Sequence, residues 1–430
     1  MNCFSTFRPS RSCLLLLASA LLSAACGVSD SESADSSSAR EYSIHYTLQP
    51  HPETSRVRVV LRLKQPGYLL RELSFPTDSR VSDIDGDGDV QIRGGTIYWQ
   101  PPAGGGELEW WIAVHSERSS GAYDALLNDD WGIFRAEDVI PRARTRTLKG
   151  AASRTTMTFD LPAGWTAISE YSAVNQPIAV DRPARRFDEP TGWIAMGKLG
   201  VRRETLAGIR VAVAGPEGHD VRRMDMLALL GWSLPELAAI LPHEFPRLTI
   251  VSAGDPMWRG GLSAPASMFI HADRPMISEN ATSSLLHEVV HTAMPINARH
   301  GYDWIVEGLA EYYSIELLRR GKAITDERAA FAFERQAEWS QQADTLCSAS
   351  SSGSTTAFAV TLFKYLDDEI SRQSGGEETL DSILPSLTGG EIDAATLAST
   401  VEELIHSVPD ALHIDNLPGC LSITPQTPEN

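Results

Sequence analysis

The sequence predicts an α+β protein of more than one domain, with a β-sandwich-like N-terminal domain and a mainly helical C-terminal domain. From residue 41 the apolar residues recur with period two, which is typical of half-buried strands. After Gly215 the pattern changes to longer segments with helical periodicity. With 430 residues and 42% hydrophobic content, the chain can bury two cores. We therefore expect a β-rich domain over residues 41–215 and a second domain over residues 216–430.

The first 25 residues are expected to be an export signal. Arg8 and Arg11 precede a largely apolar run over residues 14–22, and small residues stand directly before Cys26. The run is too short to span a bilayer. This arrangement resembles a bacterial lipoprotein signal, in which cleavage precedes a cysteine that then carries lipid; the alternative is a plain signal peptide cleaved nearby. The resemblance implies a lipid anchor in a bacterial envelope membrane, with the protein facing the periplasm or the exterior.

Residues 26–40 are expected to form a disordered tether between this anchor and the folded part. Residues 27–40 have almost no apolar content, so they cannot offset the entropy cost of ordering.

The cysteines favour one disulfide. Of the five cysteines, Cys3 and Cys13 leave with the signal and Cys26 is expected to carry lipid, which leaves Cys347 and Cys420. Two thiols in an oxidising compartment favour a bridge. The alternative is two unpaired buried thiols.

The clearest strand is residues 56–64, where Val57, Val59, Leu61 and Leu63 share one face and charged residues take nearly all of the other. Pro and Gly turns separate further strand-like runs, at residues 42–49, 96–100, 108–115, 155–161 and 209–214. Short alternating strands at this spacing predict an antiparallel sandwich or a layered sheet.

Residues 83–89 alternate Asp with Ile or Gly, and their spacing resembles a calcium-binding EF-hand loop. The twelfth position is Gly94, however, where a bidentate Glu is required, and no helical pattern flanks the segment. A hairpin turn rich in Gly and Asp is the interpretation we favour over a calcium site.

The net charge excludes one class of partner. Lys and Arg number 37 against 56 Asp and Glu, which gives a net charge of -19. Such a chain repels phosphate backbones, so we expect no nucleic acid partner.

The C-terminal domain is expected to begin with helices at residues 221–230 and 233–241, a strand at 246–251 and a loop at 258–265. Asn280 is placed to cap the next helix, which Pro295 stops. Asp303 is placed to cap a further helix that ends near Arg320, before Gly321.

These two helices carry the residues that predict chemistry. His287 and His291 are four apart, so a helix presents both imidazoles on one face, with Glu288 beside them. Glu307 follows after a short loop, where a third ligand would come from, and Glu311 lies one turn beyond it. One carboxylate can bind Zn²⁺ while the other accepts a hydrogen bond from a ligand histidine. The alternative is a helix whose histidines only pack, which leaves Glu307 unexplained.

The motif HEVVH followed by WIVEGLAEYY resembles the gluzincin metallopeptidases, specifically the glycyl aminopeptidase and membrane alanyl aminopeptidase families. The resemblance implies a thermolysin-like catalytic domain that binds one Zn²⁺ per chain, with His287, His291 and Glu307 as ligands. It implies Glu288 as the general base. Residues 365–372 and 374–376 resemble the helix and turn that follow in the glycyl aminopeptidase group.

Two positions depart from these families. Ser263, in the stretch GGLSA, stands where the families carry a Glu that binds the substrate's α-amine, and no tyrosine stands near Thr356, where they use one against the oxyanion. Tyr302, Tyr312 and Tyr313 are within sequence reach, and we keep Tyr312 or Tyr313 as the candidate oxyanion donor.

The sequence thus predicts a zinc metallopeptidase that hydrolyses a peptide or protein substrate with a metal-activated water. The two departures leave its exopeptidase specificity open. They also motivate an alternative, a non-catalytic envelope protein that keeps the fold as a binding or assembly module. A third interpretation is hydrolysis of a non-peptide bond by the same activated water.

Overall fold

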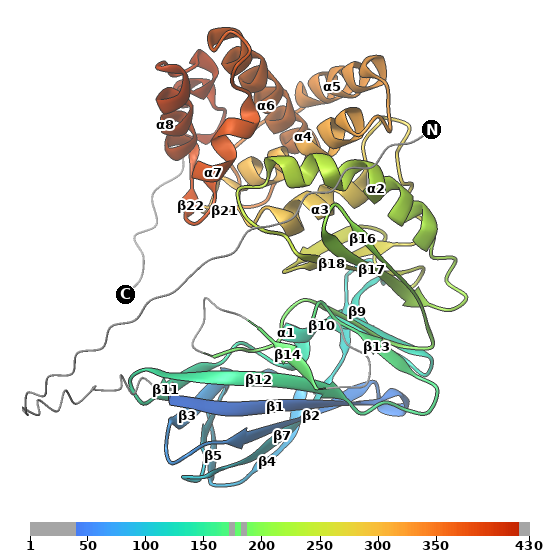
Figure 1. The fold of residues 1–430 in the computed structure, drawn as a ribbon, viewed down its shortest axis with the longest axis vertical. Coiled ribbons are helices and arrows are strands. Elements are labelled where there is room, and N and C mark those ends of the chain that lie inside the picture. Colours follow the sequence, from blue (N-terminus) through green and yellow to red (C-terminus); the bar gives the residue numbers. More distant parts are fainter. Residues whose placement is uncertain (1–39, 172–176, 182–186, 421–430) are drawn as a thin grey trace, which may run out of the picture. The chain divides into compact units, whose positions relative to one another are not determined.

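The computed structural model describes residues 40–171, 177–181 and 187–420 (Figure 1). The expected signal peptide, nearly all of the tether and the lipidation site Cys26 lie outside these described residues. Figure 1 shows strands through the blue-to-green part of the chain and helices through most of the yellow-to-red part. The α+β class expected from the sequence is confirmed at this level.

The N-terminal part contains three sheets. One has six strands in the order β14-β12-β1-β2-β7-β4, one has four in the order β11-β3-β6-β5, and one has five in the order β13-β15-β10-β9-β8. Most pairs are antiparallel, but β1 and β12 pair in parallel. The elements are β1 (Arg40–His51), β2 (Arg56–Lys64), β3 (Leu70–Pro76), β4 (Val81–Gly86), β5 (Asp89–Arg93), β6 (Thr96–Gln100), β7 (Gly105–Ala113), β8 (His115–Glu117), β9 (Tyr123–Leu127), β10 (Trp131–Arg135), α1 (Ala136–Val139), β11 (Arg144–Thr147), β12 (Ala151–Phe159), β13 (Thr166–Ile168), β14 (Ile178–Val180) and β15 (Trp193–Gly197).

The alternation of apolar and charged residues over residues 56–64 determines which face of β2 is buried. Val57, Val59, Leu61 and Leu63 are all buried and belong to one apolar core that includes Trp110. The Trp110 indole N–H donates to the Val139 carbonyl oxygen at 3.0 Å, so the ring stays in the core without an unpaired donor.

The Asp-rich stretch over residues 83–89 is a connection between two sheets and not a hairpin. β4 pairs with β7, whereas β5 pairs with β6 in the four-stranded sheet. Asp87 is used structurally, because its carboxylate accepts the Glu107 N–H at 2.9 Å and its carbonyl accepts the Trp99 indole N–H at 2.7 Å. The expectation of a hairpin was wrong because the alternating Asp and Gly residues signal a turn without indicating which strands it joins.

A fourth sheet supports the helices. Its order is β16-β17-β18-β20-β19, with β17, β18 and β20 parallel and β19 antiparallel at the edge. The strands are β16 (Leu199–Leu206), β17 (Ile209–Pro216), β18 (Arg247–Ala253), β19 (Gly261–Ala264) and β20 (Ser267–His271). Residues 258–265 were expected to be a loop, but β19 lies within them.

The first two strands of this sheet, β16 and β17, lie before or at residue 216, where the sequence division places the start of the second domain. β16 is hydrogen-bonded to β17, and β17 to β18, so both strands belong to the sheet that supports the later helices. The five-stranded sheet of the N-terminal part packs on the same sheet through a shared apolar cluster that includes Trp193, Val251 and Phe269. The division at residue 216 therefore stays a prediction.

The C-terminal part is helical and has one large apolar core. The helices are α2 (Arg223–Ile240), α3 (Ser284–Ala293), α4 (Asp303–Arg320), α5 (Asp326–Ser340), α6 (Ser354–Gln373), α7 (Leu384–Leu387) and α8 (Ala394–Ile405); β21 (Asn297–Ala298) and β22 (Glu391–Ile392) form a short ladder, and the single turns of 3₁₀ helix are Pro52–Thr54, Leu380–Ile383, Asp410–Leu412 and Ile414–Asn416. The two helices expected over residues 221–241 form one helix, α2, which continues through Pro235. Within the described ranges, no helix is long and apolar enough to cross a membrane.

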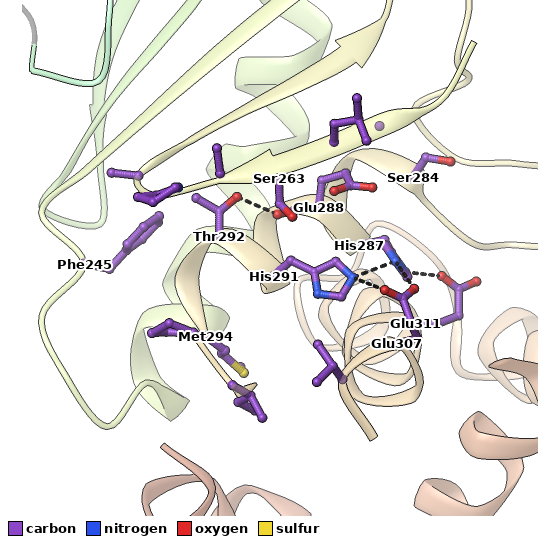
Figure 2. Close-up of a pocket in the computed structure, with 18 of the residues that line it drawn as sticks. Phe245, Ser263, Ser284, His287, Glu288, His291, Thr292, Met294, Glu307 and Glu311 are labelled. Atoms are coloured by element: carbon purple, nitrogen blue, oxygen red, sulfur yellow. Dashed lines mark hydrogen bonds and ion pairs between the residues drawn. The ribbon is translucent and has the colours of Figure 1, made fainter. Parts of the chain in front are cut away.

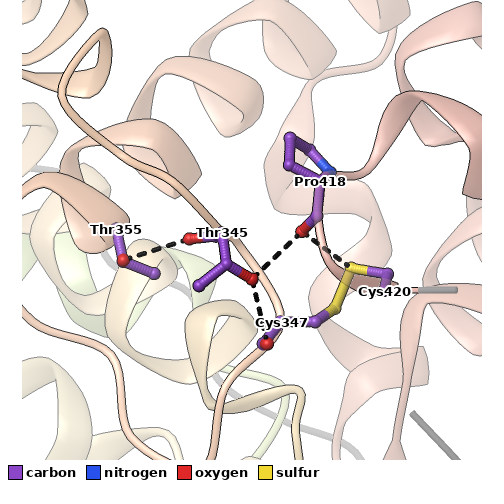
Figure 3. Close-up of a disulfide and its surroundings, with 5 residues drawn as sticks. All are labelled: Thr345, Cys347, Thr355, Pro418 and Cys420. Atoms are coloured by element: carbon purple, nitrogen blue, oxygen red, sulfur yellow. Dashed lines mark hydrogen bonds between the residues drawn. A yellow bond between two sulfur atoms is a disulfide. The ribbon is translucent and has the colours of Figure 1, made fainter. Parts of the chain in front are cut away.

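Cys347 and Cys420 form a disulfide across 73 residues (Figure 3). The neighbouring Thr345 hydroxyl donates to the Cys347 carbonyl at 3.2 Å, and the Thr355 hydroxyl donates to the Thr345 carbonyl at 3.2 Å. The bridge thus fastens the segment that leads into α6 to the end of the described residues.

Candidate metal centre

Helix α3 presents its two faces to different surroundings. Leu285, Leu286, Val289 and Val290 are buried in the helical core, which leaves His287 and His291 on the opposite, open face. The helix begins after Ser283, whose hydroxyl accepts the Leu286 N–H at 3.3 Å. Asn280 is therefore not the cap: residues 278–282 form a turn of their own, in which the Ser278 N–H donates to the Thr282 carbonyl.

Helix α4 packs closely on α6. A Cβ added at Gly308 would lie 2.5 Å from the Ala359 Cβ, so the missing side chain lets the two helices approach. Asp303 is the first residue of α4 rather than its cap, and its carboxylate accepts the Ser351 N–H at 2.6 Å. This contact holds the segment before α6 next to the start of α4.

Three side chains from α3 and α4 converge on one point (Figure 2). The Nε2 atoms of His287 and His291 lie 3.0 Å apart. Each also lies 3.3 Å from a carboxylate oxygen of Glu307. Potential ligand atoms of these three residues lie within 4.8 Å of one another.

This donor set fits a zinc ion. Two imidazole nitrogens that face each other with a carboxylate beside them supply three ligands, and a fourth position stays open, as in catalytic zinc sites. The side chains of His287, His291 and Glu307 keep 16%, 12% and 28% exposure, so a small molecule can reach the point between them.

The electrostatics of the metal-free centre also favour a cation. Burial lowers the pKa of the His287 imidazole, but its hydrogen bonds to Glu307 and Glu311 outweigh burial and raise that pKa to about 10. Burial raises the pKa of Glu307, yet its hydrogen bonds to the two histidines bring it down to about 2. The three side chains together therefore stabilise positive charge at this point, which is the charge that a metal ion would supply.

Glu288 lies on the side of α3 that faces the edge strand β19. The Ser263 N–H donates to its carboxylate. Gly261 of the same strand passes so close that an added Cβ would be 2.5 Å from the Glu288 Cγ. Burial raises the pKa of Glu288, against the lowering effect of His287 and His291. Figure 2 shows Glu288 and Ser263 on the β19 side of the candidate ligands His287, His291 and Glu307.

One cleft with a volume of about 1460 Å³ contains the site. It is lined by the three candidate ligands and by Glu288, Glu311, Gly261 and Ser263. Its walls come from β19, α3 and α4, from the segment before β18 and from the N-terminal part. Beyond the residues already described, they include Arg135, Trp258, Phe245, Arg247, Met294, Asn297 and Ser351.

Neither tyrosine that was kept as an oxyanion donor lies in the cleft. Tyr312 and Tyr313 are both fully buried in the helical core. The Tyr313 hydroxyl donates to an Asp381 carboxylate oxygen at 3.0 Å, away from His287, His291 and Glu307. Both tyrosines follow Glu311 directly, so the helix turns them away from the face that carries Glu307 and Glu311.

Arg135 and Ser351 are among the cleft residues that the sequence interpretation did not identify. Arg135 comes from the end of β10, in the N-terminal part, and no local motif links it to the histidines. Ser351 reaches the cleft through its bond to Asp303, and its hydroxyl is buried with no hydrogen-bond partner among the described residues. The disulfide at Cys347 was the one sequence signal that this segment is fixed.

No model of a known protein family matches the chain, and no curated protein matches it. Among solved structures, the fold is similar to that of an aminopeptidase N family protein from Idiomarina loihiensis, with a TM-score of 0.61. The similarity covers 85% of this chain and 76% of that chain at 13% sequence identity. It shows that this chain shares the fold of that protein over most of its length.

Proposed function

We propose that this protein is a zinc-dependent peptidase with a thermolysin-like catalytic domain and one Zn²⁺ per chain. The observation that carries the proposal is the convergence of the two Nε2 atoms and the Glu307 carboxylate at one point of a large cleft. The fold, similar to that of an aminopeptidase N family protein, supports it.

In this proposal His287, His291 and Glu307 hold the ion, and Glu311 orients His287 through Nδ1 at 3.0 Å. When bound, zinc supplies Lewis acidity that activates a water and polarises the scissile carbonyl. The Glu288 carboxylate takes a proton from the attacking water and delivers it to the leaving nitrogen. Burial raises the pKa of Glu288, which brings this carboxylate nearer to the basicity that the proton transfer needs.

The dimensions of the cleft support a peptide substrate. Its volume of about 1460 Å³ exceeds the roughly 300–1,000 Å³ of sites that enclose one small molecule. β19 is the edge strand of its sheet and lines the cleft, so an extended peptide can lie beside it.

We also propose that the protein acts in a bacterial cell envelope, held to a membrane by lipid on Cys26 and facing the periplasm or the exterior. The sequence before residue 27 motivates this location. The disulfide between Cys347 and Cys420 supports an oxidising compartment.

The test is to digest a peptide library with the zinc-loaded protein and to compare it with the Glu288→Gln variant. We expect cleavage by the parent protein, and unchanged zinc content with no cleavage in the variant. Glu244→Gln is the matched control, because Glu244 also lines the cleft and is exposed. Full activity in Glu288→Gln would remove this residue from the mechanism.

The other interpretations give different results. A binding or assembly module retains peptides without cleaving them in either protein. Hydrolysis of a non-peptide bond leaves the library intact, while ester substrates are cleaved in a manner that depends on Glu288.

A further inference from the structure

We infer that the cleft selects substrates that carry a carboxylate, and that Arg135 binds this group. The inference rests on the proposed peptide hydrolysis and names the substrate class for it. Three observations carry it: the position of Arg135, its lack of a carboxylate partner in the described part of the chain, and its link to Glu288.

Arg135 lies in the cleft wall, at the end of β10. Its Nη2 donates to the Ser263 carbonyl of β19 at 3.1 Å. Its guanidinium lies 5.1 Å from the centre of the Trp193 ring, and that indole N–H in turn donates to the Leu262 carbonyl at 2.9 Å. The guanidinium is thus fixed against the edge strand by a hydrogen bond and a cation–π contact.

The positive charge of Arg135 has no carboxylate at ion-pair distance among the residues that the structure describes. Its two acidic neighbours in sequence are not at ion-pair distance: Asp138 accepts the Arg135 backbone N–H, and Glu137 accepts the Gly192 N–H, both at 2.9 Å. The Arg135 charge acts on both carboxylates from farther away, where it opposes the rise in pKa that burial causes. The Nε atom of Arg135 is buried and has no hydrogen-bond partner within the described ranges. A guanidinium has five N–H donors, so most of its capacity is unused.

The other two arginines of the cleft differ from Arg135. Arg247 forms an ion pair with the buried Glu170 at 3.1 Å. Arg274 is exposed, and its Nε donates to the Arg259 carbonyl at 2.8 Å. Of the three, only Arg135 combines a fixed, partly buried guanidinium with the lack of a carboxylate at ion-pair distance in the described part of the chain.

Ser263 places Arg135 next to the proposed reaction. The Ser263 N–H donates to the Glu288 carboxylate, and its carbonyl accepts the Arg135 Nη2. One residue of β19 therefore separates the proposed general base from the free guanidinium. A substrate bound beside Glu288 has Arg135 within reach of a neighbouring residue.

A carboxylate is the group that meets this geometry. Arginine binds it through two parallel N–H···O bonds, whereas an ammonium group would be repelled. The carboxylate can come from an Asp or Glu side chain or from the C-terminus of a peptide, and the experiment separates these sources.

The experiment measures binding in the zinc-loaded, full-length Glu288→Gln background, so that no probe is consumed. Three heptapeptides serve as probes: one with a central Glu and an amidated C-terminus, one with Gln in its place, and the Gln peptide with a free C-terminus. Binding is followed by calorimetry and repeated after adding Arg135→Gln, Arg135→Lys or Arg274→Gln.

We expect a peptide with a carboxylate to bind roughly 10- to 100-fold more tightly than the amidated Gln peptide. Arg135→Gln should remove this preference and Arg135→Lys should retain part of it, while Arg274→Gln should leave it unchanged. A preference for the Glu peptide identifies the side chain, and a preference for the free C-terminus identifies the peptide end.

Equal binding of all three peptides, or a preference that survives Arg135→Gln, overturns the inference. Unfolding of Arg135→Gln on heating is measured first, and if that variant does not fold, Arg135→Lys and the unsubstituted background decide. Failure of the proposed hydrolysis is a separate result, because it appears as absence of cleavage by the zinc-loaded parent protein.

Discussion

The Glu311 carboxylate lies 3.0 Å from Nδ1 of His287. This contact is on the side of the imidazole opposite to the Nε2 atom that faces the candidate metal position. The Gln336 side-chain N–H₂ approaches the other carboxylate oxygen of Glu311 at 3.4 Å, and the Ser314 hydroxyl approaches the oxygen that faces His287, also at 3.4 Å. Glu311 is therefore itself held, and it fixes the tautomer of His287 that leaves Nε2 free to bind a metal.

Replacing Glu311 by Gln should weaken zinc binding by roughly 10- to 100-fold, because the ligand histidine loses a charged partner that raises its basicity. Competition with a zinc chelator measures the affinity. Glu334→Gln is the control, since it removes an exposed carboxylate from the nearby helix α5. Equal zinc affinity in Glu311→Gln and the parent protein would contradict the assigned role.

Replacing Gly261 by Ala should reduce catalysis without removing zinc. The new Cβ would lie 2.5 Å from the Glu288 Cγ and 2.8 Å from its Oε1, so either β19 or the Glu288 side chain must move. Turnover and zinc content are measured on the same preparation. Gly231→Ala is the matched control, because a Cβ at this position of α2 meets no atom within 4 Å. Normal turnover in Gly261→Ala would show that β19 moves and that the Glu288 side chain keeps its position.

The raised pKa of His287 should make zinc binding depend on pH. Only the neutral imidazole can ligate through Nε2, so a metal that binds below the His287 pKa of about 10 must displace a proton. The apparent affinity should therefore rise roughly tenfold per pH unit from about pH 7 to about pH 9, and level off near pH 10. Chelator competition at each pH measures this, and an affinity that stays flat across the range would refute it.

The raised pKa of His287 also makes the stability of the metal-free protein depend on pH. Because folding raises the pKa of His287, the protonated ring stabilises the fold fully below its unfolded value of 6.5, and this contribution is lost as the pH rises towards about 10. Thermal unfolding of the metal-free protein between these two values should show falling stability, and zinc saturation should remove that trend.

Removing the disulfide should destabilise the protein. A bridge across 73 residues stabilises by about 4 kcal/mol on the chain-entropy estimate. The Cys347→Ser/Cys420→Ser variant should therefore unfold at a lower temperature than the oxidised parent protein. A reductant should lower the unfolding temperature of the parent protein and leave the variant unaffected; identical curves for both proteins without reductant would contradict the prediction.

The sequence was informative where spacing alone determines geometry. A helix brings residues four apart to one face, so the spacing by itself pairs His287 with His291 and Glu307 with Glu311. The alternation of residues 56–64 identified β2 and its buried face for the same reason. Such local periodicities do not depend on the rest of the fold.

The features that the sequence did not reveal depend on contacts between distant segments of the chain. Arg135 reaches the cleft because the sheet of β10 packs against the sheet of β18, and no periodicity encodes that packing. Ser283 caps α3 in place of Asn280 because the turn over residues 278–282 intervenes. The direction of Tyr312 and Tyr313 follows from how α4 packs into the core, which the position of these residues beside Glu311 does not reveal.

The disulfide has a consequence for when the cleft is completed during synthesis. The segment that carries Ser351 is fastened by Asp303 on one side, and on the other through Cys347 to Cys420, which is synthesised 73 residues later. A chain whose Cys420 is still inside the ribosome, or one kept in a reducing environment, lacks the second fastening. Full rigidity of this wall thus depends on two events, translation beyond Cys420 and oxidation of the two thiols.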